Sequence, residues 1–280
     1  DLGKSTFLNR VVGQKLSIVS AKPQSTRDRV VGIVSDDDTQ MIVFDTPGLL
    51  NPRYALQRAM RGAALDALFD ADVVVYLADA KEGPAPDLAV AAQLDRVPAA
   101  PVLRVYNKAD AVDVAQRAAL AAASPEARFI SALTGEGVAE LLAEVKQRLP
   151  ESPFLYDSED ISTQSMRFFT AELVRESALE QLDEEVPYSL ACEVEEFRET
   201  RTPVYIRAVL YVERESQKRI LIGAKGTRIR AIGQSAREKV QALVGQPVYL
   251  DLWVKVLANW RKNERAMQRF GYRIPEEKPR

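Results

Sequence analysis

Histidine is absent from the 280-residue sequence, which excludes catalytic triads built on histidine and metal sites with histidine ligands. Cysteine occurs once, at Cys192, so the chain cannot form an internal disulfide and fits a reducing compartment. We interpret Cys192 as a core residue, because it alternates with Leu190 and Val194 in a strand pattern. No apolar run approaches the roughly 18 residues needed to span a bilayer. The sequence therefore predicts a globular protein of the cytoplasm.

Acidic and basic residues are nearly equal in number, which gives a net charge of −2, but they are unevenly distributed along the chain. Residues 151–200 hold 14 acidic and 3 basic residues, whereas residues 201–273 hold 5 acidic and 16 basic residues. A basic segment of this kind is typical of surfaces that meet nucleic acid phosphates. We therefore expect nucleic acid contacts in the C-terminal third.

A short apolar run at residues 41–44 predicts a buried strand that ends in Asp45. Ligands of parallel α/β sheets bind at the carboxyl ends of strands, where Asp45 can hold Mg²⁺ through a water molecule. Thr46 and Pro47 then lead to Gly48, whose N–H can approach a terminal phosphate because no Cβ is in the way. This segment is thus expected to sense whether that phosphate is present.

Gly3, Lys4, Ser5 and Thr6 match the end of a phosphate-binding loop of the form G-x-x-x-x-G-K-[ST]. The backbone N–H groups from Gly3 onward can point at phosphates from a helix N-terminus. Lys4 supplies positive charge to the β- and γ-phosphates, and Ser5 supplies a hydroxyl ligand for Mg²⁺. We expect the first glycine of the loop, and a strand before it, to precede Asp1.

Residues 21–28 are polar and lack hydrophobic periodicity, which predicts a mobile loop before a strand at residues 30–34. Thr26 can add a second hydroxyl to the Mg²⁺ when the γ-phosphate is bound, and Ser25 is the alternative. Leu49 follows Gly48 at a position where some GTPases have a glutamine that orients the attacking water. An apolar side chain cannot do this, so we expect slow intrinsic hydrolysis, or a water oriented by another group.

Two further apolar runs, at residues 73–78 and 101–106, predict parallel strands, the first of them central in the sheet. Asn107, Lys108 and Asp110 follow the second run. The carboxylate of Asp110 can accept hydrogen bonds from N1–H and N2–H₂ of guanine, a pair that adenine does not offer, so adenine is rejected. Asn107 and Lys108 brace the loop and cover the base. Reading of the guanine oxygen is assigned to the backbone of Ser131, Ala132 and Leu133.

Together these motifs predict a GTP site, because they occur in the order and approximate spacing of a GTP-binding domain. Catalytic roles are predicted for Lys4, Thr26 and Gly48, and Mg²⁺ coordination for Ser5, Thr26 and Asp45. The predicted GTP-binding residues are Gly3, Lys4, Ser5, Thr6, Asp45, Thr46, Pro47, Gly48, Asn107, Lys108, Asp110, Ser131, Ala132 and Leu133.

The second half reads as helix, strand, strand, helix, helix, strand, with alternating apolar residues near 190–194, 204–212 and 248–256. A Gly-Ala-Lys-Gly loop joins the two middle helices, and eight basic residues lie within residues 214–239. Such a loop between helices lets an RNA backbone approach closely, which predicts a type II KH domain. The predicted RNA-binding residues are Lys218, Gly223, Ala224, Lys225, Gly226, Arg228 and Arg230.

The predicted fold class is α/β, with two domains. A P-loop GTPase domain with a mainly parallel sheet covers residues 1–150, without its first strand and the start of its loop. Residues 151–162 form a linker, and an α+β type II KH domain with a C-terminal helix covers residues 163–280. Trp253 and Trp260 flank that helix, and we interpret both as packing residues, with base stacking as the alternative.

The whole chain resembles the Era family of bacterial ribosome-associated GTPases. The resemblance rests on GKST, QSTRD, DTPGL, NKAD and SALTG in the first half, and on LYVERESQKRILIGAKGTRIRAIG and LDLWVKV in the second. It implies hydrolysis of GTP to GDP with Mg²⁺, and binding of the KH domain to the 3′ end of 16S rRNA during small-subunit assembly. It also implies a monomer loosely associated with the inner membrane face. Asp1 stands where the family commonly has an asparagine linked to monovalent-cation assistance.

Two other functions stay open at this stage. One is an RNA-binding module that works without GTP and whose nucleotide site is inert, and guanine-nucleotide binding would distinguish it. The other is a membrane-recruited signalling GTPase whose KH-like domain binds protein, and salt-dependent RNA binding would speak against it.

Overall fold

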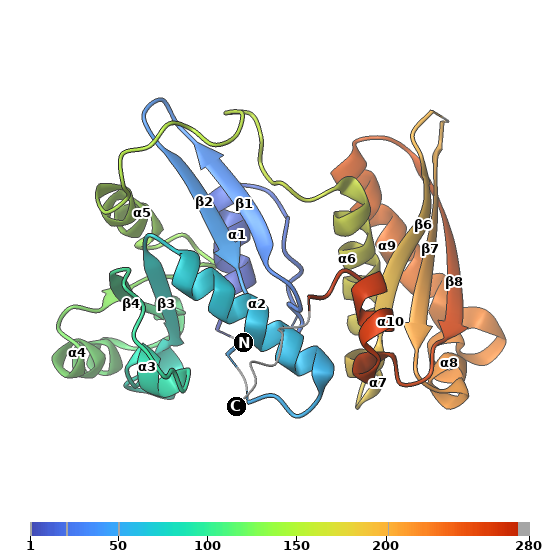
Figure 1. The fold of residues 1–280 in the computed structure, drawn as a ribbon, viewed down its shortest axis with the longest axis horizontal. Coiled ribbons are helices and arrows are strands. Elements are labelled where there is room, and N and C mark those ends of the chain that lie inside the picture. The colour runs from blue at the N-terminus through green and yellow to red at the C-terminus, as the bar shows by residue number, and fades with distance from the viewer. Residues whose placement is uncertain (1, 21, 50, 201, 274–280) are drawn as a thin grey trace. The chain divides into compact units, whose positions relative to one another are not determined.

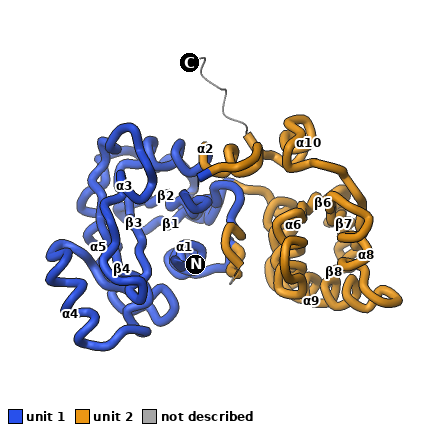
Figure 2. The backbone as a smooth tube through the Cα atoms, turned by 90° about the horizontal axis from the view of Figure 1, so that it is seen from below, with its two compact units in different colours: residues 1–17, 26–51, 63–163 blue, residues 18–25, 52–62, 164–280 orange. Residues whose placement is uncertain are grey.

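A computed structural model describes residues 2–20, 22–49, 51–200 and 202–273, so the expectation about Asp1 lies outside the described residues. The chain forms two compact units (Figure 2). The first unit contains residues 1–17, 26–51 and 63–163, and the second contains residues 18–25, 52–62 and 164–280. Two short segments from the first third of the chain are therefore part of the second unit. This was not predicted from the sequence, which indicated two continuous domains.

Helix α1, Lys4–Val12, opens the first unit and follows the predicted phosphate-binding loop directly (Figure 1). Phe7 and Leu8 are buried at helical spacing, and the helix ends at Gly13 in the left-handed conformation, as predicted. Gly3 caps the other end with a φ of 80°, so the loop residue before Lys4 also needs the conformational freedom of glycine.

Five strands of the first unit form two sheets (Figure 1). Strands β1, Val30–Ser35, and β2, Gln40–Asp45, pair antiparallel. Strands β3, Val74–Asp79, β4, Val102–Asn107, and β5, Arg128–Phe129, pair parallel in the order β3-β4-β5. Among the described strands β4 thus takes the central place that was predicted for β3. The carboxyl ends of β2, β3 and β4 each finish in a polar residue.

Helix α2, Ala55–Asp70, follows β2, and helix α5, Val138–Gln147, follows β5. Helices α3, Leu88–Ala91, and α4, Val114–Ala123, were not predicted. Short 3₁₀ turns at η1, Ala80–Glu82, and η2, Ala109–Ala111, follow β3 and β4. The core between α1, the parallel sheet and α5 is apolar and contains Phe7, Leu77, Val105, Ile130 and Leu141.

The second unit is built on the sheet β6-β7-β8, formed by Ala191–Arg198, Val204–Val212 and Val248–Val256. β6 pairs antiparallel and β8 parallel to the central β7. The element order confirms the predicted KH arrangement, with α6, Met166–Leu179, before the sheet and α8, Glu215–Ile222, and α9, Thr227–Val244, between β7 and β8. The shorter elements are α7, Val186–Ser189, η3, Ala224–Gly226, η4, Trp260–Lys262, and α10, Glu264–Arg269.

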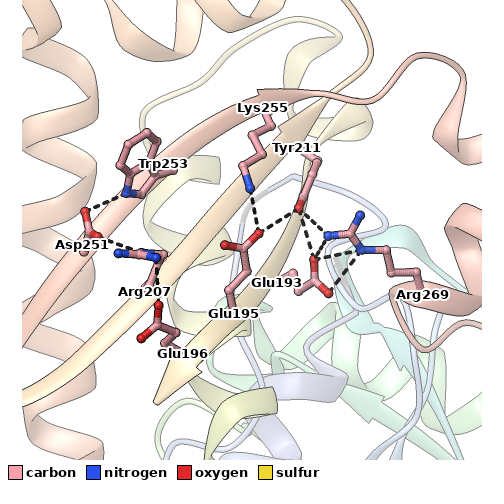
Figure 3. A network of polar contacts seen from close by, with 9 residues as sticks. All are labelled: Glu193, Glu195, Glu196, Arg207, Tyr211, Asp251, Trp253, Lys255 and Arg269. Carbon is pink, nitrogen blue, oxygen red and sulfur yellow. Dashed lines mark hydrogen bonds and ion pairs between the residues drawn. The ribbon is translucent and has the colours of Figure 1, made fainter. Parts of the chain in front are cut away.

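The two faces of this sheet differ in character. The alternating apolar residues of β7 and β8 point into a core that they share with α6 and α9. The opposite face carries a network of paired charges, in which Arg207 joins Glu196 and Asp251, and Lys255 joins Glu195 (Figure 3). Helix α10 adds Arg269 to this network, through Glu193 and Tyr211 (Figure 3).

The two tryptophans have different environments. Trp260 is fully buried and donates from its indole N–H to the carbonyl of Ser189 at 2.7 Å, which confirms its packing role. Trp253 lies on the outer face of the sheet and is 52% exposed, so for it the prediction of a core position is wrong. Cys192 packs against the core, as predicted, and burial raises the pKa of its thiol. Within the described ranges, the helices are all too short or too polar to cross a membrane.

Candidate nucleotide site and candidate RNA-binding loop

The three predicted Mg²⁺ ligands lie together in the first unit. The hydroxyl of Ser5 donates to Oδ2 of Asp45 at 2.6 Å and lies 3.1 Å from Oγ1 of Thr26. Thr26 Oγ1 is 3.4 Å from the same carboxylate oxygen. The residues come from the start of α1, the segment before β1 and the end of β2, and each is at most 8% exposed. Residues separated by up to 40 positions thus form one buried oxygen cluster.

Asp45 has the character of a cation ligand. Burial raises the pKa of its carboxyl group, and the hydroxyl groups of Ser5 and Ser17 offset this only partly. Its Oδ1 atom is buried and has no hydrogen-bond partner within the part of the chain that the structure describes. An unpaired buried carboxylate oxygen is costly, and a divalent cation or its water would satisfy it. Since no described group of three His, Cys, Asp or Glu side chains suits a metal, hydroxyl oxygens are needed to complete this donor set.

Asn107 connects the phosphate-binding loop to the loop at residues 131–133. Its side-chain amide donates to the carbonyl of Leu2 at 2.9 Å, and its Oδ1 accepts from the N–H of Ala132 at 2.9 Å. Asn107 is 2% exposed, and the bond from Ala132 is buried while the bond to Leu2 is partly buried. Arg10 of α1 holds the same loop from its other side, donating to the carbonyls of Ala132 and Leu133. Asn107 and Arg10 therefore hold the phosphate-binding loop, the end of β4 and the loop at residues 131–133 together.

The predicted base-reading groups are partly available. Asp110 is exposed and makes no hydrogen bond to any other described residue, so its carboxylate can accept from a ligand. The N–H of Ser131 donates to the carbonyl of Glu136, and that of Ala132 to Asn107. Of the three predicted N–H groups, only that of Leu133 is unused within the described chain. Reading of the guanine oxygen by Ser131, Ala132 and Leu133 stays a prediction, and in this structure only the N–H of Leu133 is available for it.

Lys108 is fixed by a residue that sequence reasoning missed. Its ammonium group lies 2.6 Å from Oδ2 of Asp79, the last residue of β3. Burial opposes ionisation of Asp79, but the hydrogen bonds from Lys108 and from the N–H of Lys81 outweigh it, so the pKa of this carboxyl is lowered. Asp79 could have been predicted as a site residue, because it lies at the carboxyl end of a parallel strand.

The remaining nucleotide-site residues surround open space. A Cβ placed on Gly48 would meet nothing within 4 Å, so this backbone can be approached. Lys4, Asp45, Thr46, Pro47 and Gly48 are among the residues that line a cavity of about 1130 Å³ in the first unit, and most of the other lining residues are apolar. Thr6 lies in the first turn of α1.

The predicted RNA-binding loop has an unusual backbone. Gly223, Lys225 and Gly226 have positive φ values of 73°, 51° and 76°. A Cβ on Gly223 would lie 2.8 Å from Cβ of Arg228, so that glycine is required by packing as well as by conformation. Ala224 and Lys225 are exposed at the tip, directly before the N-terminus of α9. The loop therefore presents backbone and positive charge to solvent.

Two of the predicted RNA-binding arginines also shape the loop. Arg228 donates to the carbonyl of Ile220 at 2.7 Å, and Arg230 donates to the carbonyl of Lys225 at 3.0 Å. These bonds tie the N-terminus of α9 to the loop and to the preceding helix α8. Lys218 lies on α8 and is half-buried. The described geometry thus gives Arg228 and Arg230 a structural role besides any contact with RNA.

Two family models match the chain. Residues 1–108 match the family described as a 50S ribosome-binding GTPase, and residues 185–261 match the KH domain family. The matches fall on the two halves in which the nucleotide cluster and the glycine loop were located. The KH match includes β6, β7, α8, α9 and β8.

Relatives of known name extend over nearly the whole chain. The protein called GTPase Era from Azotobacter vinelandii is 42% identical over 281 residues, covering 98% of this chain and 93% of that protein. GTPase Era from Ectopseudomonas mendocina is 40% identical over 280 residues, covering 97% and 93%.

Two solved structures are also similar. One is a variant of Era from Aquifex aeolicus bound to GDP and AlF4⁻, with a TM-score of 0.90, 35% identity and coverage of 98% of this chain and 96% of that one. The other is Era in complex with MgGDPNP and nucleotides 1506–1542 of 16S ribosomal RNA, with a TM-score of 0.90, 36% identity and coverage of 98% and 95%.

Proposed function

The chain belongs to the Era family of GTPases and is a GTPase, and from this premise we propose that Ser5, Thr26 and Asp45 hold the Mg²⁺ that accompanies GTP. The observation that carries the proposal is their convergence into one buried cluster in which Oδ1 of Asp45 lacks a partner. An all-oxygen donor set suits a hard cation such as Mg²⁺. A solved relative carries MgGDPNP, which supports the same choice of metal here.

The protein's own residues position the phosphates for hydrolysis. Lys4 at the first position of α1 supplies positive charge, and the N–H groups from Gly3 onward point along the helix axis toward the phosphates. The bound Mg²⁺ would neutralise charge that develops on the β- and γ-phosphate oxygens. Thr26 and Gly48 then respond to the γ-phosphate, one through its hydroxyl and the other through its N–H.

Leu49 follows Gly48 and offers no polar group to orient the attacking water. Positioning of this water therefore falls to backbone groups or to a group supplied from outside the site. Because a well-placed orienting or charge-stabilising group accelerates such reactions by orders of magnitude, we expect the intrinsic rate to be slow. A monovalent cation is a second candidate for this assistance, although Asp1 replaces the asparagine that the family links to it and lies outside the described residues.

The test of the nucleotide site is a titration with GTP, GDP and ATP as a function of Mg²⁺ concentration. Wild-type protein is expected to bind both guanine nucleotides and to reject ATP. Asp45→Asn should weaken the Mg²⁺ dependence of GTP binding, because the amide carries no negative charge. If Asp45→Asn and wild type respond identically to Mg²⁺, the assignment of the cluster is wrong.

For the KH domain we propose binding to the 3′ region of 16S rRNA in small-subunit assembly. The family description of the first half refers to the 50S particle, but a solved relative carries a fragment of the small-subunit rRNA, and this direct observation favours 16S. Support from this chain comes from the exposed Lys225 and the open backbone of the glycine loop. Binding should weaken as salt rises, because phosphate contacts release counterions.

The remaining expectations are proposals of the same kind: a monomer in the cytoplasm, with peripheral association at the inner face of the membrane. Sedimentation and membrane flotation of the whole protein test them. A signalling GTPase that binds protein through its KH-like domain would show no salt-dependent affinity for a 16S fragment. A protein with an inert nucleotide site would bind no guanine nucleotide, would show the same RNA affinity with and without added GTP, and would not hydrolyse it.

A further inference from the structure

The segment that leads to Thr26 is held by the second unit. Residues 18–25 belong to that unit, and Val19, Lys22 and Ser25 form hydrogen bonds with residues of α6. The N–H of Val19 donates to Oε1 of Glu176 at 2.9 Å. The ammonium of Lys22 donates to the carbonyl of Leu179 at 2.6 Å and also to that of Leu182. These two carbonyls lie at and beyond the C-terminus of α6, where a cation is favoured by the helix dipole.

A third anchor stands directly before Thr26. Arg175 of α6 donates from Nη2 to the carbonyl of Ser25 at 2.6 Å. The same guanidinium is clamped by Glu172, at 2.8 Å from Nε and 2.6 Å from Nη2. Arg175 is only 2% exposed, so its position is fixed by packing as well as by charge. Ser25 O belongs to the peptide group shared with Thr26, and the hold on it constrains that threonine's backbone.

The guanidinium of Arg175 is buried, and its Nη1 atom has no hydrogen-bond partner among the described residues. Burying a guanidinium carries a desolvation penalty of several kcal/mol unless its charge and donors are matched. Glu172 supplies the matching charge and outweighs burial, so the pKa of Arg175 is raised and the group stays charged. A charge-assisted bond from a fixed arginine is also stronger than a neutral one. The carbonyl of Ser25 thus accepts from a donor that is held in place. In a loop without this arginine, the same carbonyl would bind water instead.

We propose that Arg175 is a positioning residue for GTP hydrolysis, which holds Ser25 so that Thr26 presents its hydroxyl to the metal cluster. The inference rests on the proposed role of Thr26 as a Mg²⁺ ligand. Fixing one residue's backbone costs about 1–2 kcal/mol of conformational entropy. The hydrogen bonds on residues 19, 22 and 25 order this segment when the protein folds, before GTP binds. Less conformational entropy is therefore lost when the hydroxyl of Thr26 is positioned for the γ-phosphate.

The test compares Arg175→Met and Lys22→Met with wild type in GTP hydrolysis at saturating GTP and Mg²⁺. Each variant removes an anchor and leaves the cluster of Ser5, Thr26 and Asp45 intact. We expect kcat to fall about fivefold to tenfold. GDP affinity should stay unchanged, because GDP lacks the γ-phosphate whose binding involves Thr26. Lys22 is half-buried, so its variant keeps the test valid if Arg175→Met fails to fold.

Arg167→Met is the matched control. Arg167 is on the same helix and also donates to backbone carbonyls, those of Val194 and Glu195. Its loss removes a comparable arginine contact that does not involve residues 18–25. The control should keep the kcat of wild type. A kcat that falls equally in all three variants would mean a general loss of stability in the second unit, and would overturn the inference.

A double-mutant cycle separates this inference from the proposed function. If Arg175 acts through Thr26, then Arg175→Met should lower kcat much less when Thr26→Ala is already present. Full additivity of the two effects would overturn the positioning role. If Thr26→Ala alone leaves Mg²⁺-dependent hydrolysis unchanged, the proposed role of Thr26 itself fails, and the positioning role fails with it. If Thr26→Ala impairs hydrolysis but both anchor variants do not, only the inference about Arg175 is lost.

Discussion

Gly3 and Asn107 are packed so closely that a Cβ on Gly3 would lie 2.4 Å from the side-chain nitrogen of Asn107. That nitrogen is already committed to the carbonyl of Leu2, so it cannot move away without losing a buried hydrogen bond. Gly3 is therefore required by its packing against Asn107, in addition to its expected contact with the phosphates. The phosphate-binding loop and the base-reading loop must form together.

The first prediction compares Gly3→Ala with Gly13→Ala. Both glycines cap α1 with similar positive φ, so each alanine should cost about 1–2 kcal/mol of backbone strain. Only Gly3→Ala adds the clash with Asn107, and displaced packing of this kind typically costs a further 1–3 kcal/mol, roughly. We expect GDP affinity to drop for Gly3→Ala and to hold for Gly13→Ala, measured by titration calorimetry. Equal losses would contradict the packing argument.

The second prediction concerns Asp110. Inosine lacks the 2-amino group of guanine, so ITP should bind wild type about 1–3 kcal/mol more weakly than GTP does. In Asp110→Asn the paired acceptor is broken, GTP affinity should fall strongly, and the preference over ITP should shrink. Asp113→Asn is the control, because Asp113 accepts from the N–H of Gln116 as the cap of α4. A preference for GTP that survives in Asp110→Asn would remove Asp110 from the base pocket.

The third prediction is a pH dependence of stability. The folded state lowers the pKa of Asp79, so this group stabilises the fold above its unfolded pKa of about 3.9. That contribution is lost as pH falls through the unfolded and then the folded pKa. Below about pH 4, wild type should lose stability faster than Asp79→Asn, by at most about 1.4 kcal/mol per pH unit. Urea unfolding curves from pH 6 to pH 3 measure this, and parallel curves would speak against the Lys108 pairing.

The fourth prediction uses the two glycines that bracket α9. Gly226 and Gly245 have φ values of 76° and 73°, and an added Cβ at either makes no close contact. Aspartate at either position therefore adds similar strain and the same charge. Gly226→Asp should weaken binding of a 16S 3′ fragment by about tenfold or more, through repulsion of phosphates. Gly245→Asp should bind like wild type in the same salt, and a matching loss there would refute a specific role for the loop.

The fifth prediction is reciprocal coupling between GTP and RNA. Glu176 receives the N–H of Val19, and its carboxylate also lies 2.9 Å from the ammonium of Lys239 on α9. The segment before Thr26 and the helix after the glycine loop thus share one buried carboxylate. Coupling of this kind is typically worth about 1–3 kcal/mol. RNA affinity measured with a non-hydrolysable GTP analogue, with GDP and without nucleotide should differ by that amount, and three equal values would disprove the coupling.

Much of the nucleotide cluster was readable from the sequence because each residue sits at a position with a fixed chemical meaning. Ser5 follows the loop lysine, and Asp45 ends an apolar strand, so both follow from the order of motifs. Thr26 was chosen over Ser25, and the structure turns the hydroxyl of Thr26 toward Asp45. The sequence left Ser25 as the alternative, because the direction of a side chain in a loop has no sequence pattern.

Other features depend on tertiary packing and left no local signal. Ser17 donates to Asp45 because the side chain of Asn9 turns residues 16 and 17 back toward the cluster. Residues 18–25 pack on α6, which lies about 150 positions later in the chain. Trp253 lies in an alternating apolar strand and Trp260 in a polar stretch, yet Trp260 is the one that is buried. Helix α4 went unpredicted, although its capping box at Asp113 and Gln116 was a visible start signal.

Cys192 is partly buried against the core of the second unit, which has a practical consequence for experiments on this protein. Its thiol is the only one in the sequence, and its raised pKa leaves almost no reactive thiolate at neutral pH. Cysteines introduced at exposed positions, one beside the glycine loop and one on α4, would therefore take up fluorescent dyes with little background from Cys192. The wild-type chain is thus a ready starting point for measuring distances between its halves during a cycle of GTP binding and hydrolysis.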